Sequence, residues 1–367
     1  MRRRDVLAAG ALSLSLSAGC LDALEREDAW RELVVDPPEG VYVPPKVDEM
    51  ATFGTATADG LAVTLTATQP HSFWTVTGPE RARADVRDHH AVHLMATVTD
   101  LETGLAVPTS VTTTIRSRGE RVEERTLWPM LSQRMGFHHG DNAALGEDGP
   151  HVATVRIEPT RVETAGAIAD RLERSRTVDV EFEYAAAEIE SLGRRLIDED
   201  EGRGEPGAVE PMARDHGSGD GRDGHGDHGD ADSHGDGREP ALEDAVDAWL
   251  GTARSGDLEF GVGVDGSGSE AEVVATARTR YNGFSVPFAG LSIAPVREDG
   301  FGERTALTER LEADRGHHYG AAVDRTVLEA APKLAVIVDA APQLSRHEGY
   351  ETAFFDLEPA TVEVALE

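Results

Sequence analysis

Short stretches in which apolar and polar residues alternate are the feature that most constrains the fold of this chain. Five of them, rich in β-branched residues, occur in the first half: 61–68, 91–98, 110–115, 152–157 and 178–184. Successive side chains of a strand point to opposite faces, so each stretch can cover a core with one face. Several short strands at this spacing are typical of a β-sandwich. Alternation resumes after residue 250, as in 334–338, and the sequence therefore predicts an all-β protein with two modules, 51–185 and 241–367.

Two regions interrupt this pattern. Residues 185–197 and 241–250 have the composition of short helices, and the segment 198–240 between them is dominated by Gly, Asp, Glu and His. Such a composition predicts a disordered linker, so 186–240 is expected to be helix and linker. Four histidines in it could bind metal weakly and pass it on, although a solvated acidic linker is the plainer interpretation: His216, His225, His228 and His234.

The N-terminus predicts the location of the protein. Residues 2–7 begin a twin-arginine-like signal, and the apolar run of thirteen residues from Leu7 to Gly19 is too short to span a bilayer of about 30 Å. The run ends in a sequence that resembles a lipobox, so we expect 1–20 to be a signal and Cys20 to be lipidated. Cys20 is the only cysteine, which excludes disulfides and thiolate metal sites. The Pro-rich segment 21–50 is expected to be a tether to the membrane.

Charge restricts the possible partners. The chain has 68 acidic and 35 basic residues, a net charge of −33, and only two lysines, Lys46 and Lys333. This acidic, Arg-rich composition is typical of proteins from salt-loving archaea, in which salt screens the self-repulsion. A nucleic acid partner is not expected, because phosphate binding needs a basic face.

The segment 128–142 carries candidate metal ligands. Met130, Met135, His138 and His139 place two thioethers and two imidazoles around a turn at Gly136. Thioether sulfur favours Cu(I), and imidazole suits copper, iron or zinc. Core packing by the methionines and solvated histidines is an equally open interpretation of this segment alone.

A second stretch favours a metal site. His93 and Met95 are two residues apart in an alternating strand, so both side chains leave the same face. The hypothesis is that His93, Met95, Met130 and His138 converge on one ion. His71, His89 and His90 lie nearby in the sequence, but they are interpreted as surface or hydrogen-bonded histidines.

The second half of the chain echoes the first. His317 and His318, followed by Tyr319 and Gly320, parallel His138 and His139, and an alternating strand follows. The segment 346–348, Arg-His-Glu, adds His347. His317, His318 and His347 are therefore possible further ligands, or else the repeat is kept only for packing.

These motifs resemble those of the small periplasmic iron-uptake proteins that bind iron and copper, the Fe²⁺ transport protein family. Their pattern is H-x-E on one strand, a Met after a W/M-P element, then H-Y-G-x-N, and the resemblance covers roughly 50–185. It implies immunoglobulin-like β-sandwiches, usually dimeric, that bind metal outside the cell and work with a membrane iron permease. It also implies that His93, Met130 and His138 are ligands, while Met95 stands where the family has Glu. The family's last His, in an R-H-x loop, is matched only by His347 in the second half.

The sequence thus predicts a non-enzymatic, lipid-anchored protein on the outer face of the membrane that binds iron or copper for uptake. Its two modules are expected to form an intramolecular pseudo-dimer, or the chain a homodimer. Two alternatives stay open: a surface interaction lipoprotein without metal, and a copper-dependent oxidoreductase. No phosphate-binding loop, H-E-x-x-H helix or G-x-S-x-G elbow occurs in the sequence.

Overall fold

The fold is that of an all-β chain with two immunoglobulin-like sandwich modules, as the sequence predicts. It comes from a computed structural model that describes residues 36–212, 239–355 and 357–366. The signal, Cys20, most of the expected tether and the four linker histidines lie outside these residues. Among the described residues, no helix is long and apolar enough to cross a membrane.

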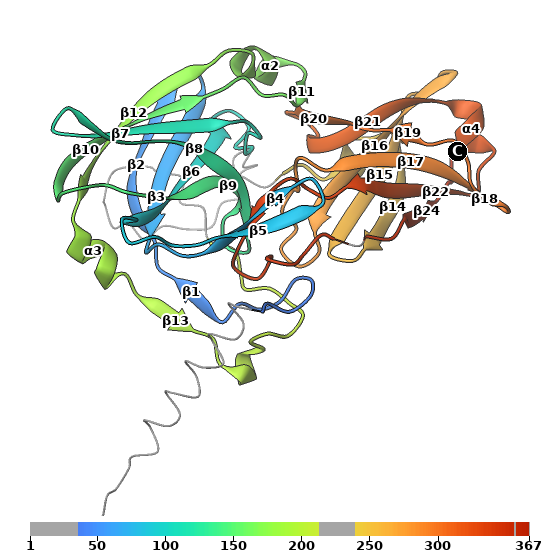
Figure 1. The fold of residues 1–367 in the computed structure, drawn as a ribbon. Helices are drawn as coiled ribbons and strands as arrows, with labels where there is room; N and C mark the ends of the chain where they lie inside the picture. Colours follow the sequence, from blue (N-terminus) through green and yellow to red (C-terminus); the bar gives the residue numbers. More distant parts are fainter. Residues whose placement is uncertain (1–35, 213–238, 356, 367) are drawn as a thin grey trace, which may run out of the picture. The chain divides into compact units, whose positions relative to one another are not determined.

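The first module has two layers that share one long strand (Figure 1). Its strands are β2 (Ala51–Ala58), β3 (Leu61–Thr68), β4 (Phe73–Thr77), β5 (Glu80–Ala84), β6 (Val92–Asp100), β7 (Val111–Ser117), β8 (Glu120–Ser132), β9 (Gly136–Ala143), β10 (Gly149–Ile157) and β12 (Arg176–Tyr184). The N-terminal part of β8 pairs with β7 in the order β12–β10–β7–β8. Its C-terminal part pairs with β9 in the order β8–β9–β6–β3–β2. All five predicted strands of this half are present.

The apolar side chains of the alternating strands fill the core between these layers. The inward residues of β3, for example Leu61, Val63 and Leu65, are almost fully buried and pack in one cluster with those of β6, β7, β10 and β12. Burial of a side chain of this size stabilises a fold by about 1.5–3 kcal/mol. The core therefore takes up one face of β6 and β9, and the opposite face of these two strands points away from it.

The second module repeats one of these layers. Its strands are β14 (Ala248–Ser255), β15 (Leu258–Asp265), β16 (Glu270–Thr279), β17 (Gly290–Arg297), β18 (Gly300–Phe301), β19 (Thr305–Ala306), β20 (Thr308–Glu312), β21 (Gly316–Asp324), β22 (Lys333–Ala340) and β24 (Ala360–Glu363). The order β20–β21–β16–β15–β14 matches β8–β9–β6–β3–β2 in the first module. The other layer follows β18–β17–β22–β24, with β19 beside β17.

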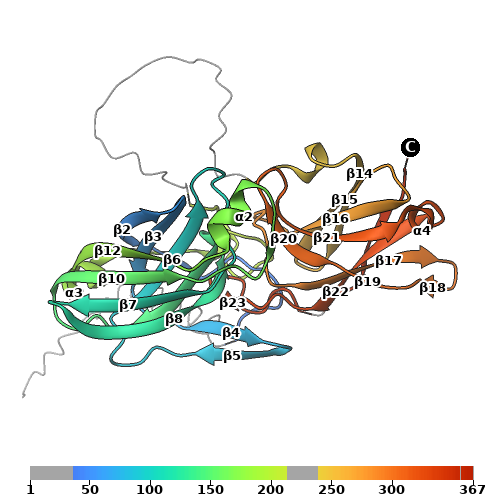
Figure 2. The ribbon, with the colours of Figure 1, turned by 90° about the horizontal axis from the view of Figure 1, so that it is seen from above.

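Two short strands connect the modules. β23 (Ser345–Arg346) of the second module runs parallel to β8 at Met130 and Leu131, and it pairs with β4 at Trp74 (Figure 2). β11 (Glu163–Thr164) of the first module pairs with β20. The residue that follows β23 is thereby placed beside the first module's sheet.

The remaining elements are short. They are β1 (Lys46–Asp48), β13 (Arg194–Leu196), α2 (Ala167–Leu172), α3 (Ala186–Ser191), α4 (Arg325–Glu329), and the 3₁₀ turns η1 (Glu199–Glu201) and η2 (Leu242–Asp244).

Three local expectations differ from the structure. The helix expected over 185–197 is only α3, and the chain then pairs as β13 with β1. The helix expected over 241–250 is only η2, because from Ala248 the chain pairs with β15 and the partner strand overrides local propensity. The described end of the expected tether is packed rather than free: Val41 and Tyr42 are buried.

Candidate metal centre

Strand register places the four proposed ligands on one face of three neighbouring strands. Cross-strand partners share a face, as do residues two apart on one strand. The pairs that define this face are His93 with Asn142, Met95 with Gly140, and Met130 with His138. The four ligand candidates are at most 1% exposed. The face is the one turned away from the first module's core cluster, since Leu94 and Ala96 belong to that cluster.

Gly140 leaves room at the centre of this face. A Cβ atom added there would lie 2.7 Å from the Met130 Sδ atom and 3.0 Å from the His93 Nε2 atom. The thioether sulfur and the imidazole nitrogen therefore face the same small space, which any larger residue would fill.

A methyl group at this position should disrupt the centre. We expect Gly140→Ala to weaken Cu(I) binding at least tenfold, because Met130 and His93 must both move away from the added carbon. Gly268→Ala is the matched control, since its nearest non-neighbouring atom would be 3.8 Å away. Competition titration with a chromophoric Cu(I) chelator measures both variants, and equal affinities would contradict the proposed position of the ion.

The second module adds His347 and brings it beside His71. The Nε2 atom of His71 lies 3.2 Å from Nδ1 of His347. The His71 ring centroid is 4.1 Å from the His93 ring centroid. One ligand atom from each of these three histidines can be chosen so that all lie within 4.8 Å of one another. The His138 ring centroid is 5.5 Å from that of His347. The structure therefore groups four imidazoles near the Met130 sulfur.

From the sequence, His71 is expected to be a surface or hydrogen-bonded histidine and not a ligand. It is half-buried, and it stands just before β4, which joins this sheet only through β23. Its backbone N–H donates to the Asn142 side chain over 3.3 Å. No local pattern signals this position, because the contact depends on a strand some 270 residues away.

Hydrogen bonds orient the rings toward the shared space. The Nδ1 atom of His93 lies 3.1 Å from Oδ1 of Asn142, and Nδ1 of His138 donates to the Gly136 carbonyl over 2.9 Å. Such contacts fix which ring nitrogen is left to bind a metal. The Nε2 atoms of His93, His138 and His347 are buried and have no hydrogen-bond partner among the described residues. A buried polar atom without a partner costs about 1–3 kcal/mol, which a bound ion would offset.

Burial keeps these imidazoles neutral. It lowers the pKa of His138 to about 4, and it holds the pKa of His71, His93 and His347 well below the usual value. Repulsion by neighbouring imidazoles lowers the pKa of the latter three further. Neutral imidazole is the form that binds metal, so protons would not compete with an ion near pH 7.

The loop that carries His347 is held in place from three sides. The Tyr42 N–H donates to the Gly349 carbonyl over 3.1 Å, and Nε2 of Gln133 donates to the Tyr42 carbonyl over 2.8 Å. Glu348 accepts from the backbone N–H of Arg134 over 3.1 Å. Gly349 has φ 86° and no space for a Cβ atom beside Gln133. The segment expected as a tether therefore helps to position a candidate ligand.

The other candidates do not join this group. His139 points to the opposite face, where its Nε2 donates to the Thr109 carbonyl over 2.9 Å. Met135 lies in the turn between β8 and β9, with its N–H bonded to the Ser132 hydroxyl. His317 lies in the second module, 2.7 Å from Glu309, and His318 is in that module too.

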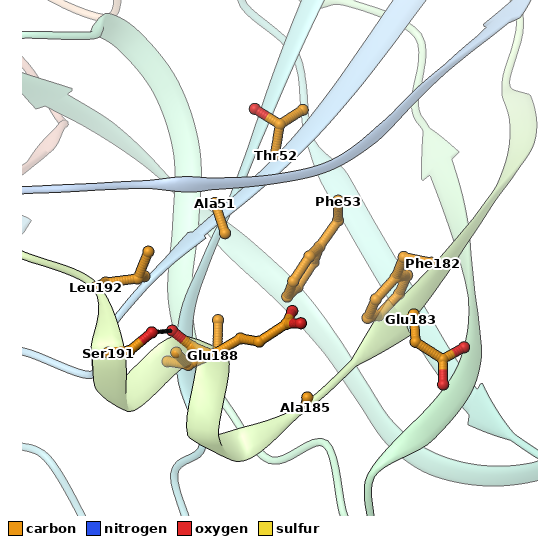
Figure 3. Close-up of a pocket in the computed structure, with 10 residues that line it drawn as sticks. Ala51, Thr52, Phe53, Phe182, Glu183, Ala185, Glu188, Ser191 and Leu192 are labelled. Atoms are coloured by element: carbon orange, nitrogen blue, oxygen red, sulfur yellow. Dashed lines mark hydrogen bonds between the residues drawn. The ribbon is translucent and has the colours of Figure 1, made fainter.

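A separate cavity of about 380 Å³ lies between β2, β12 and α3 (Figure 3). Phe53 and Phe182 stack in it with centroids 4.3 Å apart. The residues that line it include Glu183 and Glu188 but no imidazole or thioether, so it does not compete as the metal centre.

Comparison with known proteins adds three likenesses. The model of a domain of unknown function, DUF7350, matches residues 243–363. The structure of FetP from uropathogenic Escherichia coli is 19% identical, with 37% of this chain and 97% of that one covered and a TM-score of 0.28. The copper-reconstituted P19 protein of Campylobacter jejuni is 18% identical over 37% of this chain and 97% of that one, also with a TM-score of 0.28. No curated protein matches the chain.

Proposed function

We propose that the chain binds one copper or iron ion among His93, His138, Met130 and His347. The observation that carries this proposal is a group of three buried Nε2 atoms that have no hydrogen-bond partner in the described part of the chain. They belong to two different modules. His71 lies within reach as a further ligand, and Met95 lies beside Gly140 on the same face.

The donor set favours copper over iron. Thioether sulfur is a soft ligand that prefers Cu(I), and imidazole suits copper, iron and zinc. Met95 stands where the resemblance implies a carboxylate, so one hard ligand is replaced by another soft one. We therefore propose Cu(I) as the ion held most tightly, with Fe²⁺ as the alternative.

In the cell we propose a lipid-anchored carrier on the outer face of the membrane that passes the ion to a permease. The support is the signal-like run that ends at Cys20, together with the resemblance of the motifs. The role is binding rather than turnover. Oxidation of an added reductant by the copper-loaded chain, faster than by free copper, would favour an oxidoreductase instead.

The two modules are proposed to act as an intramolecular pseudo-dimer. β23 of the second module pairs with β8 of the first, directly beside Met130, and His347 follows at once. One chain would then supply both of the packed modules that two subunits supply in a dimer.

A pair of matched variants tests the binding site. His138 and His318 have the same local setting, since each donates from Nδ1 to a glycine carbonyl two residues earlier. We expect His138→Ala to weaken Cu(I) binding at least tenfold and His318→Ala to leave it unchanged. Chelator competition at high salt measures both, and equal losses in the two variants would refute the site.

A further inference from the structure

The second module holds a counterpart of each position that β6, β8 and β9 contribute to the metal centre. Arg310 pairs with His318 across β20 and β21, as Met130 pairs with His138 across β8 and β9. Gly320 pairs with Val274 on β16, where the first module pairs Gly140 with Met95. The counterparts are Glu272 for His93, Val274 for Met95, Arg310 for Met130, His318 for His138 and Gly320 for Gly140.

This register corrects the alignment expected from the sequence. The sequence alone matches His317 to His138, but the strand pairing matches His318 to His138 and Tyr319 to His139. The hydrogen bonds agree, because Nδ1 of His318 donates to the Gly316 carbonyl over 3.1 Å. Gly316 and Gly136 also share a positive φ, 67° and 69°.

The space in front of Gly320 is filled by an ion pair. A Cβ atom added at Gly320 would lie 3.0 Å from Nη1 of Arg310 and 3.2 Å from Oε1 of Glu272. In the first module the sulfur of Met130 and the imidazole of His93 face this same point. Arg310 and Glu272 form an ion pair here.

A second guanidinium neutralises the remaining acidic groups. Arg315 pairs with Asp265, and its Nη1 lies 3.2 Å from Glu272 and 3.8 Å from Glu312. His318 is fully buried, and its Nε2 atom has no hydrogen-bond partner among the described residues. That atom is 3.9 Å from Oε2 of Glu312.

We propose that Glu272, Glu312 and His318 are the donor set of a second divalent cation site, in which the guanidinium of Arg310 takes the place of the ion. Carboxylate and imidazole are ligands that zinc accepts. The guanidinium keeps its charge at all ordinary pH values, so it excludes a second cation by repulsion while it neutralises Glu272. The second module is then metal-free at this site because it carries its own cation.

Two variants, one neutral and one charged, test this proposal. Arg310→Met removes the guanidinium that faces Gly320, while Arg315 stays, and it inserts the residue that the first module has at this position. Arg310→Lys keeps a cation there. Equilibrium dialysis with Zn²⁺ at high salt should show one more bound equivalent in Arg310→Met than in the wild-type chain, and none in Arg310→Lys. Adding His318→Ala to Arg310→Met should remove this equivalent.

The readout is a difference from the wild-type chain, so it does not depend on whether the first module binds an ion. The proposal is overturned if Arg310→Met gains no equivalent, or if the wild-type chain binds one that His318→Ala removes. If Arg310→Met does not fold, Arg310→Gln also removes the charge and is judged by the same criterion.

Discussion

Replacing His347 by alanine is expected to lower the affinity of the intact chain for Cu(I) by at least a hundredfold, or about 2.7 kcal/mol. His347 is the ligand candidate that the second module supplies, and its ring lies close to those of His71, His93 and His138. Removing it would leave the ion with donors from the first module only. Chelator competition at high salt measures the change.

His89→Ala is the control for this variant, because His89 is exposed in the loop before β6. Its affinity should equal that of the wild-type chain. Thermal unfolding of His347→Ala should show that the sandwich is intact. Wild-type affinity in folded His347→Ala would show that the second module is a packing partner and not part of the centre.

Acidification from pH 6.5 is expected to destabilise the metal-free chain strongly. Burial lowers the pKa of His138, His139 and His318 to about 4 each. In the unfolded chain these imidazoles take up protons below about pH 6.5, whereas in the folded chain they stay neutral. The stability that they contribute is therefore complete above pH 6.5 and is lost as the pH falls toward 4.

The size of this effect follows from linkage. Each imidazole lowers the free energy of unfolding by up to about 1.4 kcal/mol per pH unit in this window. Three of them therefore lower it by about 4 kcal/mol over one unit. The melting temperature at pH 5.5 should therefore be lower than that at pH 7.5, in the same concentrated salt. The lowered pKa values of His71, His93 and His347 act in the same direction, while the pKa of Glu348, which burial raises to about 7, opposes the loss. In His318→Gln the decrease should be smaller, because one imidazole with a lowered pKa is removed. A melting temperature that is unchanged by pH would show that these rings titrate normally.

The fold could be predicted because its cause is local. Alternation along 61–68 and 178–184 fixes which residues face the core, and both segments are strands in the structure. The same period of two placed His93 and Met95 on one face, as the register with β9 shows.

The rest of the centre depends on contacts that no local pattern contains. β23 is two residues long, and within the described residues its strand partners are β8 and β4, so its position could not be deduced from its own sequence. His71 becomes part of the group through that strand. The expected helices failed because a partner strand overrides local propensity. β13 pairs with the distant β1, whereas β14 forms a hairpin with the next strand, β15.

The comparison of the two modules shows what specifies the candidate centre. Both share the glycine-turned hairpin and a buried imidazole bonded to a glycine carbonyl. They differ in what faces the central glycine, a thioether and an imidazole in one and an ion pair in the other. The residue types alone would assign metal binding to both the 138–139 and the 317–318 His-His motifs.

The metal content of the protein purified from its own host at high salt tests the central proposal most directly. Elemental analysis should find one copper or iron ion per chain in the wild-type protein, and less than a tenth of that in His138→Ala prepared in the same way. A wild-type chain that is folded but contains no stoichiometric transition metal, and takes up none when copper or iron is supplied, would contradict the account.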